Sequence, residues 1–140
     1  MFLFHRSKKY RNSANVLKKK GPNGIYSKEE FKRSIEKERA RADRNNHILS
    51  LVIFDMGSSD QKNDTTVHLI RRIKDRVRCI DEVGWYDNQR IGIVLPYTSN
   101  KGAIRLTENI CEFLDGSIPK TVCKVYTYPL DELNSKYRGP

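Results

Sequence analysis

The chain has 140 residues, of which 37% are hydrophobic and 31% are charged, and its formal net charge is +10. This length and composition suit one soluble domain whose core needs neither disulfides nor bound metals. The sequence holds no run of the roughly 18–20 apolar residues that a membrane span requires, and its first apolar stretch is too short for a signal peptide. We therefore expect a cytoplasmic protein that does not cross a membrane, with its three cysteines reduced and no zinc site.

The positive charge is concentrated at the start of the chain. Residues 1–20 contain seven lysines and arginines and no acid, which leaves 20 basic and 17 acidic residues in the rest of the chain. We predict a basic flexible arm over 1–20, a folded domain over 21–129 and a C-terminal tail over 130–140. By its charge alone the arm suits nucleic acid or an anionic membrane surface as a partner, and a role in solubility only is equally open.

The first half of the domain predicts a helix, a strand and a second helix. Ser27 and Glu30 have the spacing of a capping box, so a helix should run over about 29–44. Seven of the nine residues in 48–56 are apolar, which is typical of a central strand buried on both faces. Another helix begins near 63–65, where apolar residues start to recur every four positions. The apolar positions that we expect on the buried sides are Phe31, Ile35 and Ala42 in the first helix, and Leu69, Ile73 and Val77, with Ile70 and Ile80 beside them, in the second.

The second half predicts a hairpin, a helix and a last strand. Strands over 83–86 and 90–95 flank a good two-residue turn at 87–88. A third helix opens at 99–100, and 121–128 is typical of a strand. The resulting order is that of an α/β (α+β) sandwich, in which helices pack against a mainly antiparallel sheet with a central hairpin.

Three features of the hairpin region have a shared spacing. Arg78 and Asp81 form an Arg-x-x-Asp motif five residues before the turn, which reads Asp-Asn-Gln-Arg-Ile at 87–91. Asp55 ends the first predicted strand, and the strand after the turn runs into Pro-Tyr-Thr. In this arrangement the chain resembles a GGDEF domain, the module of diguanylate cyclases, over about residues 25–128. The resemblance implies the nucleotide-cyclase palm fold, with flanking helices on a mainly antiparallel sheet.

The chemistry of that family is missing at the turn. An active member carries Gly-Gly-acid-Glu-Phe there, whereas this chain has Asp87 and Asn88 in place of the glycines and Gln89 and Arg90 in place of the acids. Mg²⁺ needs closely placed carboxylates, and a cationic guanidinium repels it. Asp55 matches the family's first-strand metal ligand, although its position also suits a cap at the start of a loop. We therefore expect a degenerate domain with no catalytic residue, no metal and no cofactor, in which Asp55 is a relic.

The resemblance implies that Arg78 and Asp81 are the family's inhibitory site, which binds cyclic di-GMP. The residue types suit that ligand, because an Arg fork can donate to the O6 and N7 edge of guanine or to phosphate. An Asp can accept from guanine N1–H and N2–H. A surface ion pair between the two side chains is the alternative.

These observations favour a non-catalytic regulatory or signalling domain, either a cyclic di-GMP receptor or a protein-docking module with a protein partner or a second copy of itself. The resemblance associates such degenerate domains with sugar transferases in bacterial exopolysaccharide machinery. One alternative is a divergent nucleotidyl cyclase that uses other carboxylates. The other is a nucleic-acid-binding protein that uses the basic arm, although the chain lacks the aromatic and basic signature of an RNA-recognition module.

Overall fold

A computed structural model describes residues 20–56, 64–113 and 123–129. In chain order its elements are η1 (Pro22–Gly24), α2 (Lys28–Asn45), β1 (Leu49–Asp55), α3 (Asp64–Arg76), β2 (Glu82–Trp85), β3 (Arg90–Pro96), α4 (Asn100–Phe113) and β4 (Cys123–Tyr128). Residues 1–19 of the predicted arm over 1–20, and the tail over 130–140, lie outside the described residues, so the three-part division stays a prediction. No helix in the described part is long and apolar enough to cross a membrane.

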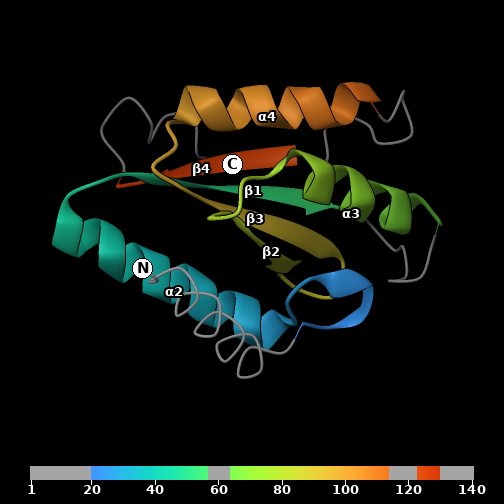
Figure 1. Cartoon of the computed structure of the whole chain (residues 1–140), viewed down its shortest axis with the longest axis horizontal. Helices are drawn as coiled ribbons and strands as arrows, with labels where there is room; N and C mark the ends of the chain where they lie inside the picture. The colour runs from blue at the N-terminus through green and yellow to red at the C-terminus, as the bar shows by residue number, and fades with distance from the viewer. Residues whose placement is uncertain (1–19, 57–63, 114–122, 130–140) are drawn as a thin grey trace, which may run out of the picture.

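The sheet forms the middle of three layers (Figure 1). Its strands are ordered β2-β3-β1-β4, and each neighbouring pair runs antiparallel. The helices α3 and α4 lie on one face and α2 lies on the other. This confirms the predicted α/β class, the antiparallel sheet and the hairpin, which β2 and β3 form.

β1 is the interior strand that its apolar composition predicts. Val52 and Phe54 are fully buried in a core with α3 and α4, whereas Leu49 is buried beneath α2. Successive side chains of a strand point to opposite faces, so a strand covered on both faces must be apolar almost throughout. The strand pairs with β3 on one side and β4 on the other.

α2 begins and ends at residues that satisfy its free backbone groups. The Ser27 hydroxyl accepts a hydrogen bond from the Glu30 N–H at 3.3 Å, as the capping box predicts. At the other end Asn46 adopts a left-handed conformation with φ 57°, and its N–H bonds to the Ala42 carbonyl. The predicted helix limits are therefore confirmed within about two residues.

The buried side of α2 includes two polar residues that the sequence pattern did not predict. Ser34 and Glu38 are buried, and Ile35 is only half-buried. The Ser34 hydroxyl donates to Glu82 Oε1 at 2.7 Å, and Glu38 pairs with Arg41 at 3.2 Å. Burial of these polar groups is tolerated because each has a partner.

The second helix also departs from its prediction at one position. Leu69, Ile70 and Ile73 are buried in the core, and Val77 packs against that core partly buried. Ile80 is 46% exposed, because α3 ends at Arg76 and the helical spacing no longer applies beyond it.

The ring of Phe31 rests on two glycines of the hairpin. Gly84 and Gly92 face each other across β2 and β3, and Phe31 is 1% exposed. A Cβ atom at Gly84 would lie 2.7 Å from the Phe31 ring, and one at Gly92 would lie 2.6 Å from it. Only glycine leaves room for the ring to approach the strands this closely.

The residues just before α2 belong to the packed domain. The Tyr26 N–H donates to the Val83 carbonyl at 3.0 Å, and the Trp85 N–H donates to the Tyr26 carbonyl at 2.9 Å. Ile25 beside it is 1% exposed within the core. The outer edge of β2 is thus covered over the length of these contacts, which protects it from pairing with another chain.

The close contact of Phe31 with Gly84 and Gly92, which we call the seat of Phe31, predicts that a methyl group added to either glycine lowers the stability of the fold. Gly84→Ala should lower the free energy of unfolding by about 1–3 kcal/mol, because the ring must move away from the strand. Gly21→Ala is the matched control, since its Cβ would make only an ordinary contact, 3.5 Å from the Ile25 carbonyl oxygen. Urea denaturation of the two variants measures the difference, and equal stability of Gly84→Ala and the wild type would contradict the seat.

Candidate functional site

The C-terminal end of β1 and the hairpin turn lie next to each other at the same end of the strands, as the resemblance implies. Asp55 is the last residue of β1 and is paired in register with Arg90, the first residue of β3. The Met56 N–H donates to the Gln89 carbonyl at 2.8 Å, which continues this pairing into the turn. Asp55 and the hairpin turn are therefore neighbours in the sheet.

The turn is closed by an ion pair between Asp87 and Arg90. Asp87 Oδ2 accepts from Arg90 Nε at 2.8 Å and from Arg90 Nη2 at 2.6 Å. Asp87 Oδ1 accepts from the backbone N–H groups of Gln89 and Arg90 at 2.9 and 2.8 Å. Because the side chain caps the loop, the turn spans residues 86–89, and the predicted two-residue turn is too short.

This ion pair shifts the pKa of both partners. The hydrogen bond from Arg90 lowers the pKa of Asp87 below its ordinary value of 3.8, against the opposing effect of burial. Asp87 in turn raises the pKa of Arg90, and the charge of Asp55 adds to that effect. The guanidinium also lies 5.1 Å from the centre of the Tyr86 ring. Both side chains are about 40% exposed, so the pair contributes at most about 1 kcal/mol to stability.

The Asp87 carboxylate is already engaged by its neighbours in the turn. Both oxygens of Asp87 are occupied by hydrogen bonds, and a positive charge stands between Asp87 and Asp55. Within residues 20–56, 64–113 and 123–129, no three acidic, His or Cys side chains are grouped closely enough to hold a metal ion. A divalent cation would have to displace the Arg90 guanidinium before it could use the Asp87 carboxylate.

Arg78 and Asp81 bind each other at the corner between α3 and β2. Arg78 Nε and Nη2 donate to the two Asp81 carboxylate oxygens at 3.1 and 2.8 Å, and the Arg78 N–H donates to Asp81 Oδ2 at 2.7 Å. Arg78 Nη2 also donates to the Pro96 carbonyl and to Thr98 Oγ1. The Asp81 side chain is 2% exposed and that of Arg78 is 49% exposed. Asp81 therefore does not point outward, although ligand binding by the two residues stays a prediction.

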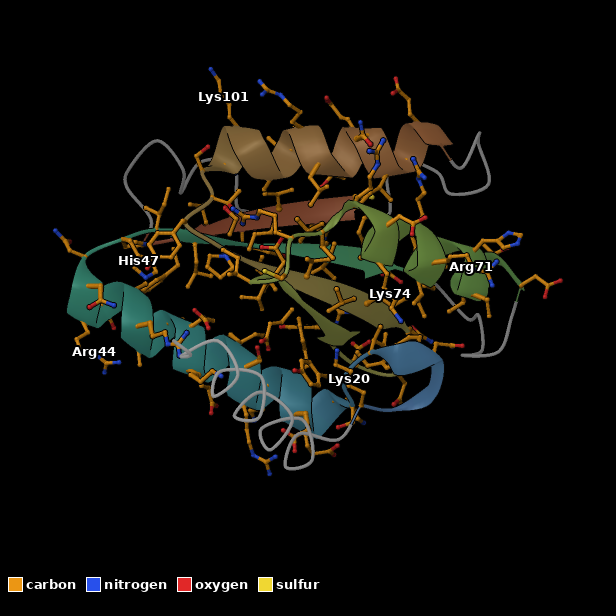
Figure 2. The ribbon with its side chains drawn as sticks, viewed as in Figure 1. Lys20, Arg44, His47, Arg71, Lys74 and Lys101 are labelled. Carbon is orange, nitrogen blue, oxygen red and sulfur yellow. The ribbon has the colours of Figure 1, made fainter. Side chains whose placement is uncertain are left out.

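Lys74 of α3 contacts the segment that precedes α2. Lys74 Nζ donates to the Asn23 carbonyl in η1 at 3.4 Å and lies against Gly24. Figure 2 shows Lys74 and Arg71 on the side of the molecule where Lys20 lies. Because α3 ends at Arg76, Arg78 does not continue the helix face that carries Arg71 and Lys74.

An apolar groove, which the sequence did not predict, runs between α2 and the β1–β4 half of the sheet. Its volume is about 290 Å³, and it adjoins a hollow of about 600 Å³ that continues along α2 to Tyr86. The residues that line the groove are Ile35, Arg39, Leu49, Leu51, Val94, Tyr126, Thr127 and Tyr128. The Arg39 guanidinium lies 4.7 Å from the centre of the Tyr128 ring, and the Tyr128 hydroxyl donates to Asp43 Oδ1 at 2.6 Å. The groove therefore has an apolar floor with a cationic and a hydrogen-bonding rim.

Comparison with known proteins identifies the fold. No protein-family model and no curated protein matches the sequence. Among solved structures, the chain is similar to a DGC protein from Thermotoga maritima, with 20% identity, a TM-score of 0.63, and coverage of 80% of this chain and 88% of that one. It is also similar to the GGDEF domain of DgcB from Caulobacter crescentus in complex with c-di-GMP, with 10% identity, a TM-score of 0.62, and coverage of 79% and 73%.

A third similar structure is the diguanylate cyclase SiaD in complex with its activator SiaC from Pseudomonas aeruginosa. Its identity is 16% and its TM-score is 0.67, and the match covers 96% of this chain and 60% of that one. The likenesses are all at or below 20% identity, so they show the fold rather than the activity.

The ion pair at the turn predicts how Asp87 titrates. In Arg90→Gln the pKa of the Asp87 carboxyl should rise toward 3.8, because the largest cause of its lowering is the hydrogen bond from Arg90. A carboxyl with a lowered pKa contributes stability above pH 3.8, and that contribution is lost as the pH falls through the pKa of the folded state. Arg90→Gln should therefore be less stable than the wild type near neutral pH, and the difference should shrink in acid.

Carboxyl titration by NMR measures this shift directly. Arg33→Gln is the control, because it breaks a similar pair with Glu30 on α2. An Asp87 pKa that is the same in the wild type and in Arg90→Gln would contradict the pairing.

Proposed function

The chain has the fold of a GGDEF domain, and we propose that it uses this fold for regulation and not to synthesise a cyclic dinucleotide. The observation that supports the proposal is the Asp87–Arg90 ion pair at the turn. Synthesis from GTP needs two divalent cations held by carboxylates near the triphosphate. Here the turn's carboxylate is paired with a guanidinium, and Asp87 carries a side chain at a position where a glycine would let phosphate approach the backbone.

We expect no reaction with GTP. The protein incubated with GTP and Mg²⁺ or Mn²⁺ should leave the nucleotide unchanged, because loss of the metal-binding acids removes several kcal/mol of transition-state stabilisation. The active GGEEF domain of the Vibrio cholerae diguanylate cyclase is a suitable positive control. Product that forms with the wild type and disappears with Asp55→Asn would overturn the proposal and favour a divergent cyclase.

The proposed regulatory ligand is cyclic di-GMP, bound at the corner of Arg78. Half of the Arg78 side chain is exposed, and Asp81 holds its guanidinium in a fixed orientation. Nε and Nη2 are used in these contacts, so the guanidinium would donate to guanine O6 or N7, or to a phosphate, through Nη1. Asp81 would then position the arginine and would not itself contact the base, because its carboxylate is buried.

Calorimetric titration with cyclic di-GMP tests this site. The wild type should bind, and Arg78→Ala should bind at least about tenfold more weakly, since one charge-assisted contact is worth about 1.5–3 kcal/mol. Arg78→Lys keeps the positive charge but loses the planar guanidinium, so it should also bind more weakly. This variant serves as the test if Arg78→Ala fails to fold. Arg33→Ala is the control, because Arg33 is an exposed arginine on α2. No binding by the wild type at high micromolar ligand, or equal binding by the Arg78 variants, would reject the site.

Protein docking is the second candidate function, and the apolar groove along α2 favours it. Exposed apolar grooves with a few polar groups at the rim are typical of binding surfaces. A protein partner or a second copy of the chain would suit this surface. A setting beside the sugar transferases of bacterial exopolysaccharide machinery, which the resemblance implies, is part of the same proposal. If the cyclic di-GMP titration fails, docking remains as the regulatory function.

A further inference from the structure

Two cysteines from different layers of the fold lie in contact. Cys111 is in the last turn of α4, Cys123 is the first residue of β4, and their Sγ atoms are 3.5 Å apart. Both are free thiols, with Cys111 8% exposed and Cys123 half-buried. Cys79 is the remaining cysteine, and it is exposed on the connection between α3 and β2.

We propose that Cys111 and Cys123 are a reversible modification site that reacts with low-molecular-weight disulfides and is converted to an intramolecular disulfide. A disulfide bond is about 2.05 Å long, so the two sulfur atoms need to approach by only about 1.5 Å. That approach is within the range of small side-chain rotations at two residues that already touch. This inference is independent of the proposed regulatory function, because neither cysteine belongs to the turn, the Arg78 corner or the groove lining.

The reaction proceeds by two exchange steps that balance. Cys123 is the more exposed of the pair, so it loses its proton and its thiolate attacks one sulfur of the small disulfide, whose S–S bond breaks and releases one thiolate. Cys111 then loses its proton and attacks the Cys123 sulfur, which expels the second small thiolate. The two protons end on the two small thiols, and the two electrons lost by the cysteines reduce the small disulfide.

The surroundings of the pair set its rate. Burial raises the pKa of Cys123, and the neighbouring Cys111 raises it further. The reactive thiolate is therefore scarce at neutral pH, so exchange should be slow there and should accelerate in alkaline solution. Once the mixed disulfide forms, its resolution is fast because Cys111 is already in contact with Cys123.

The disulfide would link β4, at one edge of the sheet, covalently to α4. Among the described strands, β4 pairs only with β1, and it carries Tyr126 and Tyr128, which line the groove. A covalent link between β4 and α4 limits the separation of this strand from the helix layer. Oxidation should therefore make the wall of the groove more rigid and the fold harder to unfold.

The test uses oxidised glutathione at pH 8 as the small disulfide. In the Cys79→Ser background the treated protein should lose about 2 Da, the mass of two hydrogens, without keeping a glutathione adduct, and dithiothreitol should reverse the change. The melting temperature of the oxidised protein should be about 5–10 °C higher than that of the reduced protein. Cys79 in the wild type is the internal control, because it should keep a stable adduct.

A second variant separates the two exchange steps. With Cys111→Ser in the same background, Cys123 should hold a stable glutathione adduct, and the increase in melting temperature should be absent. A stable adduct on Cys123 while Cys111 is present, or no loss of mass in the Cys79→Ser protein, would overturn the proposal. The mass of the treated Cys79→Ser protein decides the matter by itself if the Cys111 variant does not fold.

Discussion

The ring of Phe31 lies directly on the backbone of Gly84 and Gly92, and the position of α2 follows from that contact. α2 packs mainly on β2 and β3, and Ser34 there donates to Glu82, the first residue of β2. The C-terminal half of α2 extends over β1 and β4, where the Tyr128 hydroxyl donates to Asp43 and the apolar groove lies between the helix and the strands. The Phe31 contact thus fixes one end of α2 on the hairpin, and the groove along the rest of the helix is the surface available to a partner.

The hairpin keeps its shape for reasons that do not depend on the chemistry at its turn. Its two strands are held by their own pairing, by β1 on one side and by the segment at Tyr26 on the other. The turn residues are therefore free to differ without loss of the fold, and in this chain Asp87 and Arg90 neutralise each other there. At the Arg78 corner, too, the carboxylate has a structural role, because Asp81 is buried and holds the arginine in place.

Local patterns predicted most of the fold. The capping box at Ser27, the apolar run of β1 and the hairpin are all confirmed, because each depends on residues close in sequence. The seat of Phe31, the groove and the contact between Cys111 and Cys123 were not predicted, since each joins residues that only the packing of layers brings together. A half-buried apolar residue such as Leu51 has the same sequence signature whether it lies in a core or lines a groove. The hydrogen bonds of the turn could not be predicted either, because the spacing of two charged residues does not show where their side chains point.

The central claim is that the hairpin turn and the end of β1 do not bind the divalent cations of a cyclase. Paramagnetic Mn²⁺ tests this claim most directly. In the presence of GTP, amide NMR signals of Asp55, Met56 and residues 86–90 should keep their intensity relative to those of α2 as Mn²⁺ is added in substoichiometric amounts. This is expected because the Arg90 guanidinium is hydrogen-bonded to the Asp87 carboxylate and adds positive charge beside Asp55. Selective loss of those signals, and not of signals from α2, would show a metal bound at the turn and would contradict the account.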